Sequence, residues 1–195
     1  MINRTKIIAI TLTGALAAAA LTGCGGSSAS SSAAPSSVSE AQVASPASSA
    51  AASSVLDNAA ENSSSALDGI YNTLLEADPI SNQFEIAAMN IEYDFGLPAE
   101  DVASYKGVKS NDNGDAGLVL VIEAADGKAE DVANKLAAYQ QDQVAFYGNY
   151  AEFAQAQTNV ENAVIAFKDN TVVMVIASNE STADLDSAVD SALAN

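Results

Sequence analysis

The sequence contains no histidine and only one cysteine, Cys24. Without histidine the chain lacks the commonest general base, the Ser-His-Asp and Cys-His catalytic arrangements, and the imidazole ligands of zinc, haem and blue-copper sites. A single cysteine forms no disulfide within one chain, so a packed core must stabilise the fold. The remaining carboxylate, lysine, hydroxyl and amide groups indicate no particular chemistry, and we expect no cofactor.

Basic residues are also scarce. Seven Lys and Arg oppose 25 Asp and Glu, which gives a formal net charge of −18 at pH 7. This balance argues against a nucleic-acid partner, because phosphates require basic patches. It also argues against a domain that lies flat on an anionic membrane surface. Solubility and mutual repulsion explain such acidity more simply than a specific cation site does.

The first 23 residues have the layout of a secretory signal peptide. Arg4 and Lys6 precede an apolar run over residues 7–21 that is too short to span a membrane comfortably. The tetrad Leu21-Thr22-Gly23-Cys24 resembles the bacterial lipobox. That resemblance implies cleavage before Cys24, attachment of a diacylglyceryl group to its thiol with fatty acids such as palmitate, and a lipid anchor on the extracytoplasmic face of the cell membrane. Two acyl chains meet the requirement for stable anchoring.

An ordinary signal peptide with a cysteine near its cleavage site is the alternative. The complete match to the tetrad and the otherwise unexplained lone thiol favour the lipobox. Cleavage before Cys24 removes two basic residues and no acid, which changes the formal charge from −18 to −20.

Residues 24–64 are dominated by Ser, Ala and Gly and cannot bury enough apolar surface to order themselves. A flexible coil of about 40 residues would hold a domain at a root-mean-square distance of roughly 35 Å from the lipid. The sequence therefore predicts a signal peptide over residues 1–23, a lipidated cysteine and tether over residues 24–64, and a single acidic domain over residues 65–195.

The domain is expected to open with a helix. Ser65 and Asp68 have the spacing of a capping box, an apolar stripe begins at Leu67, and Asp78-Pro79 ends the helix. Residues 80–95 fit a strand in one part and a helix in another, and both readings stay open. Pro98 then opens a short helix that is expected to reach about residue 104.

Two strand-turn-strand-helix units follow. The first has strands near residues 105–110 and 118–123, a turn with Asn113-Gly114, and a helix from about Lys128. The second has strands near residues 164–167 and 172–177 around Asp169-Asn170, a pair suited to a tight hairpin, and a helix capped by Ser181 with Asp184 that runs through residue 193.

The second strand of each unit is apolar at consecutive positions, so both of its faces should be covered. The first strands carry Lys106, Lys109 and Lys168, which are typical of sheet edges. We therefore predict an α+β fold with a four-stranded antiparallel sheet of order 1-2-4-3 and the unit helices on one face. The N-terminal helix, or a second molecule in a weak homodimer, would cover the opposite apolar face.

Five aromatic residues lie at near-helical spacing between the two units: Tyr139, Phe146, Tyr147, Tyr150 and Phe153. Such a stripe can line a groove for a sugar or another ligand. At this spacing it more often forms core, and core is the interpretation we favour.

Acidic clusters provide the only candidate sites. Asp112-Asn113-Gly114-Asp115 places oxygen ligands around a glycine turn, as calcium loops do, but Lys109 would occupy the first ligand position of an EF-hand. A polar hairpin turn is favoured, and Asp112 with Asp115 remains a weak candidate calcium site. The pairs Glu130-Asp131 and Asp184 with Asp186 lie in first helical turns, where acids stabilise the helix dipole.

Three stretches resemble one known family: residues 111–121 (NDNGDAGLVLV), residues 126–129 (DGKA) and residues 146–150 (FYGNY). Together they look like domain of unknown function 4358, a family of lipoproteins from clostridium-like bacteria, with a resemblance that spans about residues 66–176. The resemblance implies a lipoprotein with an α+β fold. It implies no activity, substrate or catalytic residue.

The function expected from these observations is a non-catalytic surface lipoprotein whose acidic module contacts an envelope protein, a peptide or a small solute. A small envelope hydrolase that uses two carboxylates is one alternative, and a cleft with two acids about 5 to 9.5 Å apart would favour it. A ligand-capturing subunit of an importer is another, although the domain is small for a two-lobed receptor.

Overall fold

The structure is a computed structural model that describes residues 2–4, 59 and 64–194. In these residues six strands form one antiparallel sheet, in the order β1-β5-β6-β4-β3-β2. The strands are β1 (Asn3–Arg4), β2 (Gln83–Glu85), β3 (Val102–Ser110), β4 (Leu118–Ala124), β5 (Val164–Lys168) and β6 (Thr171–Ile176). The helices are α2 (Ser65–Ala77), α3 (Ala129–Gly148), α4 (Ala154–Glu161) and α5 (Leu185–Ala194), with short turns η1 (Asn90–Asp94), η2 (Ala99–Asp101) and η3 (Ala151–Phe153).

The α+β class is confirmed, and the four expected strands take the expected order, β3-β4-β6-β5. The hairpin at Asp169-Asn170 is also confirmed, because Lys168 pairs with Thr171 and Asp169 has a φ of 54°. The prediction of only four strands is wrong. The first strands are not edges, because β2 pairs outside β3 and β1 pairs outside β5.

The lysines that suggested edges have other roles. Lys106 Nζ lies 2.6 Å from a carboxylate oxygen of Asp68 on α2, and Lys109 Nζ lies 3.2 Å from Asp94. Lys168 donates to the carbonyl of Leu193 at the end of α5. Each ammonium group therefore satisfies an oxygen on a covering segment, so charge on these strands did not mark an open edge.

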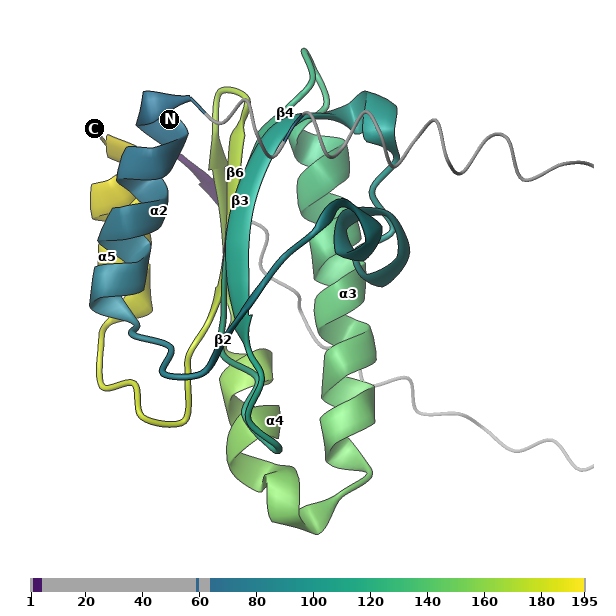
Figure 1. The fold of residues 1–195 in the computed structure, drawn as a ribbon, viewed down its shortest axis with the longest axis vertical. Helices are drawn as coiled ribbons and strands as arrows, with labels where there is room; N and C mark the ends of the chain where they lie inside the picture. The colour runs from purple at the N-terminus through teal and green to yellow at the C-terminus, as the bar shows by residue number, and fades with distance from the viewer. Residues whose placement is uncertain (1, 5–58, 60–63, 195) are drawn as a thin grey trace, which may run out of the picture. The chain divides into compact units, whose positions relative to one another are not determined.

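The uniform apolar character of β4 and β6 follows from burial on both faces, as predicted. Leu120 pairs with Met174 and both side chains enter the first core cluster, whereas Val119 pairs with Val175 and both enter the second. Successive residues of a strand point to opposite faces, so one register supplies both clusters. The sheet is the middle layer of a three-layer arrangement (Figure 1).

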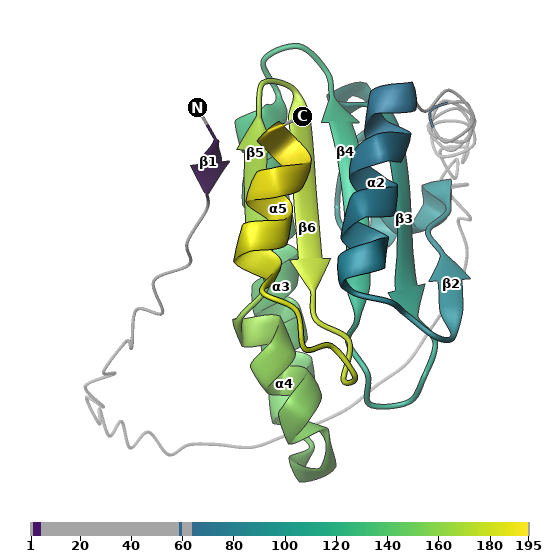
Figure 2. The same ribbon diagram turned by 90° about the vertical axis from the view of Figure 1, so that its left-hand side faces the viewer.

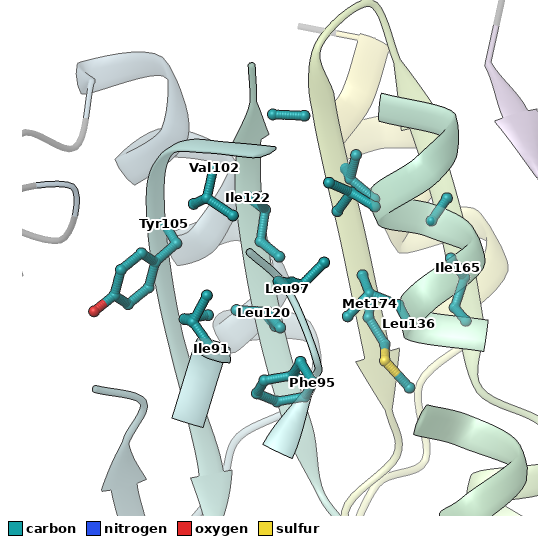
Figure 3. Close-up of a cluster of buried hydrophobic side chains, with 14 of the residues drawn as sticks. Ile91, Phe95, Leu97, Val102, Tyr105, Leu120, Ile122, Leu136, Ile165 and Met174 are labelled. Carbon is teal, nitrogen blue, oxygen red and sulfur yellow. The ribbon is translucent and has the colours of Figure 1, made fainter. Parts of the chain in front are cut away.

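The first face is covered by α3 and by the segment around η1. Figure 3 shows Ile91, Phe95 and Leu97 over the β3–β4 part of the sheet, with Leu136 of α3 near Met174. All of these side chains are buried. Helix α4 adds Val160 to the same cluster.

The second face is covered by α2 and α5 together (Figures 1 and 2). The side chains that they bury are Leu67, Tyr71 and Leu74 from α2 and Leu185, Val189, Ala192 and Leu193 from α5. The prediction that both unit helices share one face is therefore wrong, since α3 and α5 lie on opposite faces. The expected cover by the N-terminal helix is confirmed, and α5 completes it.

Helix boundaries differ slightly from expectation. The cap of α2 is Ser64, whose Oγ accepts from the N–H of Leu67 at 3.2 Å, and not Ser65. Asp184 caps α5 by accepting from the N–H of Ser187 at 3.1 Å, so the helix starts later than Ser181. Neighbouring serines and acids offer alternative caps of similar strength, so spacing alone does not select one.

The region left open resolves into several short pieces. It contains strand β2, then η1, a π-helical turn, while η2 after Pro98 ends at Asp101. The helix expected to reach residue 104 is therefore too long, because β3 has already begun at Val102. Segments this short carry too few residues for periodicity to distinguish strand from helix.

Most of the predicted signal peptide and tether, including Cys24, lies outside the described residues. The exceptions are residues 2–4, of which Asn3–Arg4 forms β1, Ala59, which is buried in the first core cluster, and Ser64, which caps α2. In the described part of the chain, no helix is long and apolar enough to cross a membrane.

Candidate functional site

The two residues of the weak calcium candidate lie in the β3–β4 loop, where their oxygens bind protein donors. Asp112 Oδ1 accepts from the side-chain amide of Asn82 at 2.9 Å. Asp115 Oδ1 accepts from the N–H groups of Gly117 at 3.1 Å and Asn179 at 3.0 Å. Among the residues described, no three histidine, cysteine or acidic side chains are placed to hold a metal ion. The geometry fits a polar turn, and the calcium site stays a prediction.

The backbone conformation and the surroundings of residue 114 require glycine in this turn. Its φ is +77°, and a Cβ atom built on it would lie 2.7 Å from the ring of Phe153. The turn is also tied to the β6–α5 loop, because Asn179 Nδ2 donates to the Gly114 carbonyl at 2.9 Å. The loop is therefore held between an aromatic ring and a neighbouring loop.

The aromatic stripe divides into two groups. Tyr139 and Tyr147 are partly buried and pack against the first core cluster, as the core interpretation predicts. Phe146 and Tyr150 are 52% and 44% exposed, so for them that interpretation is wrong. Phe153 joins the two groups, with ring centroids 6.0 Å from Tyr147 and 5.4 Å from Tyr150. Phe146 lies in the last turn of α3, and Tyr150 follows the end of the helix.

Two cavities lie beside Tyr139, and we call them together the Tyr139 groove. The larger, of about 260 Å³, is lined by Tyr93, Asp94, Phe95, Gly96, Lys135, Ala138, Tyr139 and Asp142. The smaller, of about 140 Å³, is lined by Lys109, Ser110, Asp115, Ala116, Gly117, Leu118, Tyr139, Gln143, Tyr147 and Ile176. Aromatic and charged side chains line both cavities, and the smaller one also has the amide of Gln143. Each cavity is below the usual 300 to 1,000 Å³ of a drug-sized site, so each suits a small group or one side chain.

Hydrogen bonds to the Asp94 carboxylate hold one wall of the Tyr139 groove in place. The Asp94 carboxylate accepts from the Asn90 amide at 2.9 Å and from Lys109 Nζ at 3.2 Å. Asn90 also accepts from the N–H of Ala87. These contacts fix η1 against β3. π-Helical turns are rare and often lie at functional sites, and sequence reasoning missed this one because residues 80–95 show no clear period.

Tyr93, which lines the larger cavity, is exposed, as are two other large apolar side chains of residues 84–93. Tyr93 is 61% exposed, Met89 on the same turn is 64% exposed, and Phe84 of β2 is 42% exposed. Lys109 Nζ lies 5.2 Å from the centre of the Phe84 ring, which places a cation over an aromatic face. An exposed aromatic side chain beside a cavity is typical of an interaction surface.

Burial raises the pKa values of the two phenols of α3 that line the groove, Tyr139 and Tyr147. Burial raises the pKa of Tyr139 strongly above its ordinary value, with smaller contributions from Tyr147 and Asp94. Burial and the nearby Asp115 likewise raise the pKa of Tyr147. Its hydroxyl donates to the Asp115 carbonyl at 3.3 Å. Both phenols are neutral at pH 7 even at the ordinary tyrosine pKa of about 10, and the raised pKa keeps them neutral to a more alkaline pH.

The acid pairs considered for hydrolysis do not line this groove. Glu130 and Asp131 lie in the first turn of α3, where Asp131 also faces Lys128 at 3.7 Å. Asp184 caps α5, and hydrogen bonds from Ser187 lower its pKa. The two carboxylates that do line the larger cavity are Asp94 and Asp142, and sequence reasoning did not single them out.

A family model described as "Domain of unknown function (DUF4358)" matches residues 76–177. This span is just over half of the 195 residues. The chain belongs to the DUF4358 family. No curated protein and no solved structure matches the chain.

The DUF4358 match contains every residue that lines the Tyr139 groove. It runs from the end of α2 through β6, so the groove residues between Tyr93 and Ile176 all fall within it. Helix α5 and nearly all of α2 lie outside the match. The groove is therefore part of the DUF4358 unit itself, whereas the cover of the second sheet face is added by flanking segments.

Proposed function

We propose that this protein is a non-catalytic lipoprotein, anchored through Cys24 on the extracytoplasmic face of the cell membrane. Its acidic domain binds another envelope component, a peptide or a small solute in the Tyr139 groove. The lipobox-like tetrad at residues 21–24 supports the anchor. The Ser/Ala-rich stretch that follows supports a tether that lets the domain reach a partner away from the lipid.

The observation that carries the binding role is the pair of cavities that share Tyr139. Their neutral phenols, the amide of Gln143 and the charged groups of Lys135 and Asp142 offer donors and acceptors of several kinds. The exposed ring of Tyr93 at the rim supplies apolar contact area. Such a mixture suits a peptide segment or a polar solute with an apolar face better than a purely hydrophobic ligand.

The anchor is tested with Cys24→Ser in the full chain. The wild-type protein is expected in the membrane fraction, with an N-terminal peptide that begins at an acylated Cys24 in mass spectrometry. The variant should keep residues 1–23 and carry no acyl group. A soluble wild-type protein with an unmodified thiol would contradict the anchor and leave the groove untouched.

The binding role is tested with a photo-crosslinking residue at position 93 of the full chain in its own envelope. The matched control carries the same residue at position 150, because Tyr150 is also an exposed aromatic but lies outside the groove. A product specific to position 93 is expected. Tyr93→Ala should then weaken the affinity for that molecule about tenfold, as loss of an aromatic anchor does, while Tyr150→Ala should leave it unchanged. Equal products at both positions would refute a groove-specific partner.

One observation favours the alternative of a carboxylate hydrolase, namely that Asp94 and Asp142 line the same cavity. If this function holds, the purified chain turns over glycan or peptide substrates, and Asp142→Asn abolishes turnover while the fold is retained. A pure binder shows no turnover. The Asp94 carboxylate is already engaged by Asn90 and Lys109, so the non-catalytic function is preferred.

A further inference from the structure

One edge of the sheet is occupied by residues from the start of the chain. Strand β1 pairs antiparallel with β5, with Asn3 opposite Phe167 and Arg4 opposite Ala166. Figure 2 shows β1 alone beside β5, away from the other strands. The pairing extends the sheet by main-chain contact, which is how extended peptides bind exposed sheet edges.

Ile2 and Arg4 are two residues apart, so their side chains point to the same face of the sheet, the face that α5 covers, and they add two further contacts. Ile2 packs against the second core cluster. The Arg4 guanidinium binds the carboxylates of Asp186 and Asp190 on α5, and its Nη2 also donates to the Asp186 carbonyl at 3.0 Å. The arginine side chain is 23% exposed, whereas the two acids are 65% and 53% exposed. An apolar residue followed two positions later by a cation therefore fits this edge.

The occupant lies ahead of the cleavage site that the proposed function requires. Removal of residues 1–23 would take β1 away and leave the β5 edge, Asp186 and Asp190 without the groups that now contact them. An uncovered edge offers unpaired N–H and C=O groups to another chain. The inference rests on the proposed processing at Cys24, but it concerns a surface of β5 and α5 that is separate from the Tyr139 groove.

The acidic side chains of α5 beside the β5 edge favour a partner that carries positive charge. A second copy paired edge to edge would bring another acidic α5 to the interface, and the chain already has a net charge of −18. A segment with a basic residue would replace the contacts of Arg4. We infer that, in the processed protein, the β5 edge binds an extended protein segment that carries an apolar residue followed two residues later by arginine or lysine.

The test measures binding of a labelled peptide with the sequence of residues 1–6 to the processed chain isolated from membranes, by fluorescence anisotropy. Saturable binding is expected, together with slower amide hydrogen exchange at residues 164–168. Changing the peptide arginine to glutamate should weaken binding about fivefold or more, since two partly exposed ion pairs are lost. The Asp186→Asn/Asp190→Asn chain should bind the unchanged peptide more weakly by the same factor.

The matched control is a chain with two exposed acids changed elsewhere, Glu130→Gln/Glu161→Gln, which should bind the peptide as the wild type does. The unprocessed full chain should bind more weakly, because its own residues 2–4 compete. The inference is overturned if the peptide with glutamate in place of arginine binds equally well. It is also overturned if binding leaves amide hydrogen exchange at residues 164–168 unchanged. A processed chain that dimerises through this edge and is not dissociated by the peptide also overturns it.

Failure of the proposed anchor would be seen separately. Mass spectrometry of the isolated chain shows whether residues 1–23 are present, and this result does not depend on peptide binding. If they are retained, the full chain with Arg4→Glu tests the edge alone, because that change removes the native ion pairs. Peptide binding to this variant supports the edge as a docking surface without the anchor, and its absence overturns it.

Discussion

At the scale of single residues, one buried hydrogen-bonded pair, Asp78 and Ser178, joins the end of α2 to the loop that follows β6. Asp78 is completely buried at the end of α2 and accepts from both the N–H and the hydroxyl of Ser178, at 3.0 to 3.2 Å. The sequence marks Asp78 only as part of a helix stop. Its partner lies 100 residues further along the chain, so no local pattern reveals the contact.

Asp78→Ala is expected to lower the free energy of unfolding by about 3 kcal/mol, because two buried donors of Ser178 lose their acceptor. Ser178→Ala removes only the hydroxyl donor and should cost about 1 kcal/mol. Asp112→Ala, at an exposed acid in the β3–β4 loop, is the control and should change stability by less than about 0.5 kcal/mol. Urea unfolding measures all three. Equal effects of Asp78→Ala and Asp112→Ala would disprove the importance of the buried bond.

Ionisation of Tyr139 is expected to make the free energy of unfolding depend on pH in the alkaline range. Its pKa is raised in the folded state above the ordinary 10.0, mainly by burial. The folded state therefore retains a proton that the unfolded state has lost. This contribution is fully present below pH 10 and is lost as the pH rises through the folded-state pKa, by at most about 1.4 kcal/mol per pH unit.

Tyr139→Phe removes this titrating group, so its stability should fall less steeply than that of the wild type above pH 10. Urea unfolding at several pH values between neutrality and the alkaline limit measures the difference. Lysines and the other tyrosines titrate in both proteins and cancel in the comparison. If the free energy of unfolding of the two proteins fell equally steeply with pH, the pKa of Tyr139 would not be raised in the folded state.

At the scale of elements, long and strongly patterned segments were predictable and short ones were not. The apolar runs of β4 and β6, the long helix α3 and the hairpin at Asp169-Asn170 all lie where the sequence places them. Strand β2 and turn η1 are set by contacts with β3, through Ile86 to Gly107 and Asp94 to Lys109. Such pieces have little intrinsic preference, so tertiary contacts choose their conformation.

Strand β3 contains a glycine that its neighbours require. A Cβ atom on Gly107 would lie 2.9 Å from side-chain atoms of Ile86 and Leu120 and from the Val119 carbonyl oxygen. Gly107→Ala should destabilise the fold by about 1 to 3 kcal/mol, as overpacking does. Gly69→Ala in α2 meets no atom within 4 Å and should stabilise by roughly 0.5 to 1 kcal/mol through helix propensity. Thermal and urea unfolding test the opposite signs, and two changes of the same sign would contradict the packing of β3.

At the scale of the whole molecule, net charge opposes the compact state. With a formal charge of −18, self-repulsion should weaken the fold at low ionic strength. Raising the ionic strength from about 0.01 M to about 0.15 M shortens the screening length from roughly 30 Å to roughly 8 Å. The melting temperature should rise by a few degrees over this range. A variant with Glu76, Glu130 and Glu180 changed to glutamine should respond less, and a melting temperature that falls with salt would indicate that ion pairs dominate.

Hydrophobic period, turn residues and strand charge were enough to predict the α+β class and the order of the four central strands, because the patterns of long strands and hairpins are local. Three sequence motifs were enough to predict the DUF4358 membership. The lipid anchor at Cys24 remains a prediction from the sequence. The packed fold determines which face each helix covers, since α3, the η1 segment and Val160 of α4 enter the first core cluster, whereas α2 and α5 enter the second. It likewise created the Tyr139 groove, because its walls come from segments that meet only when the sheet and α3 pack together.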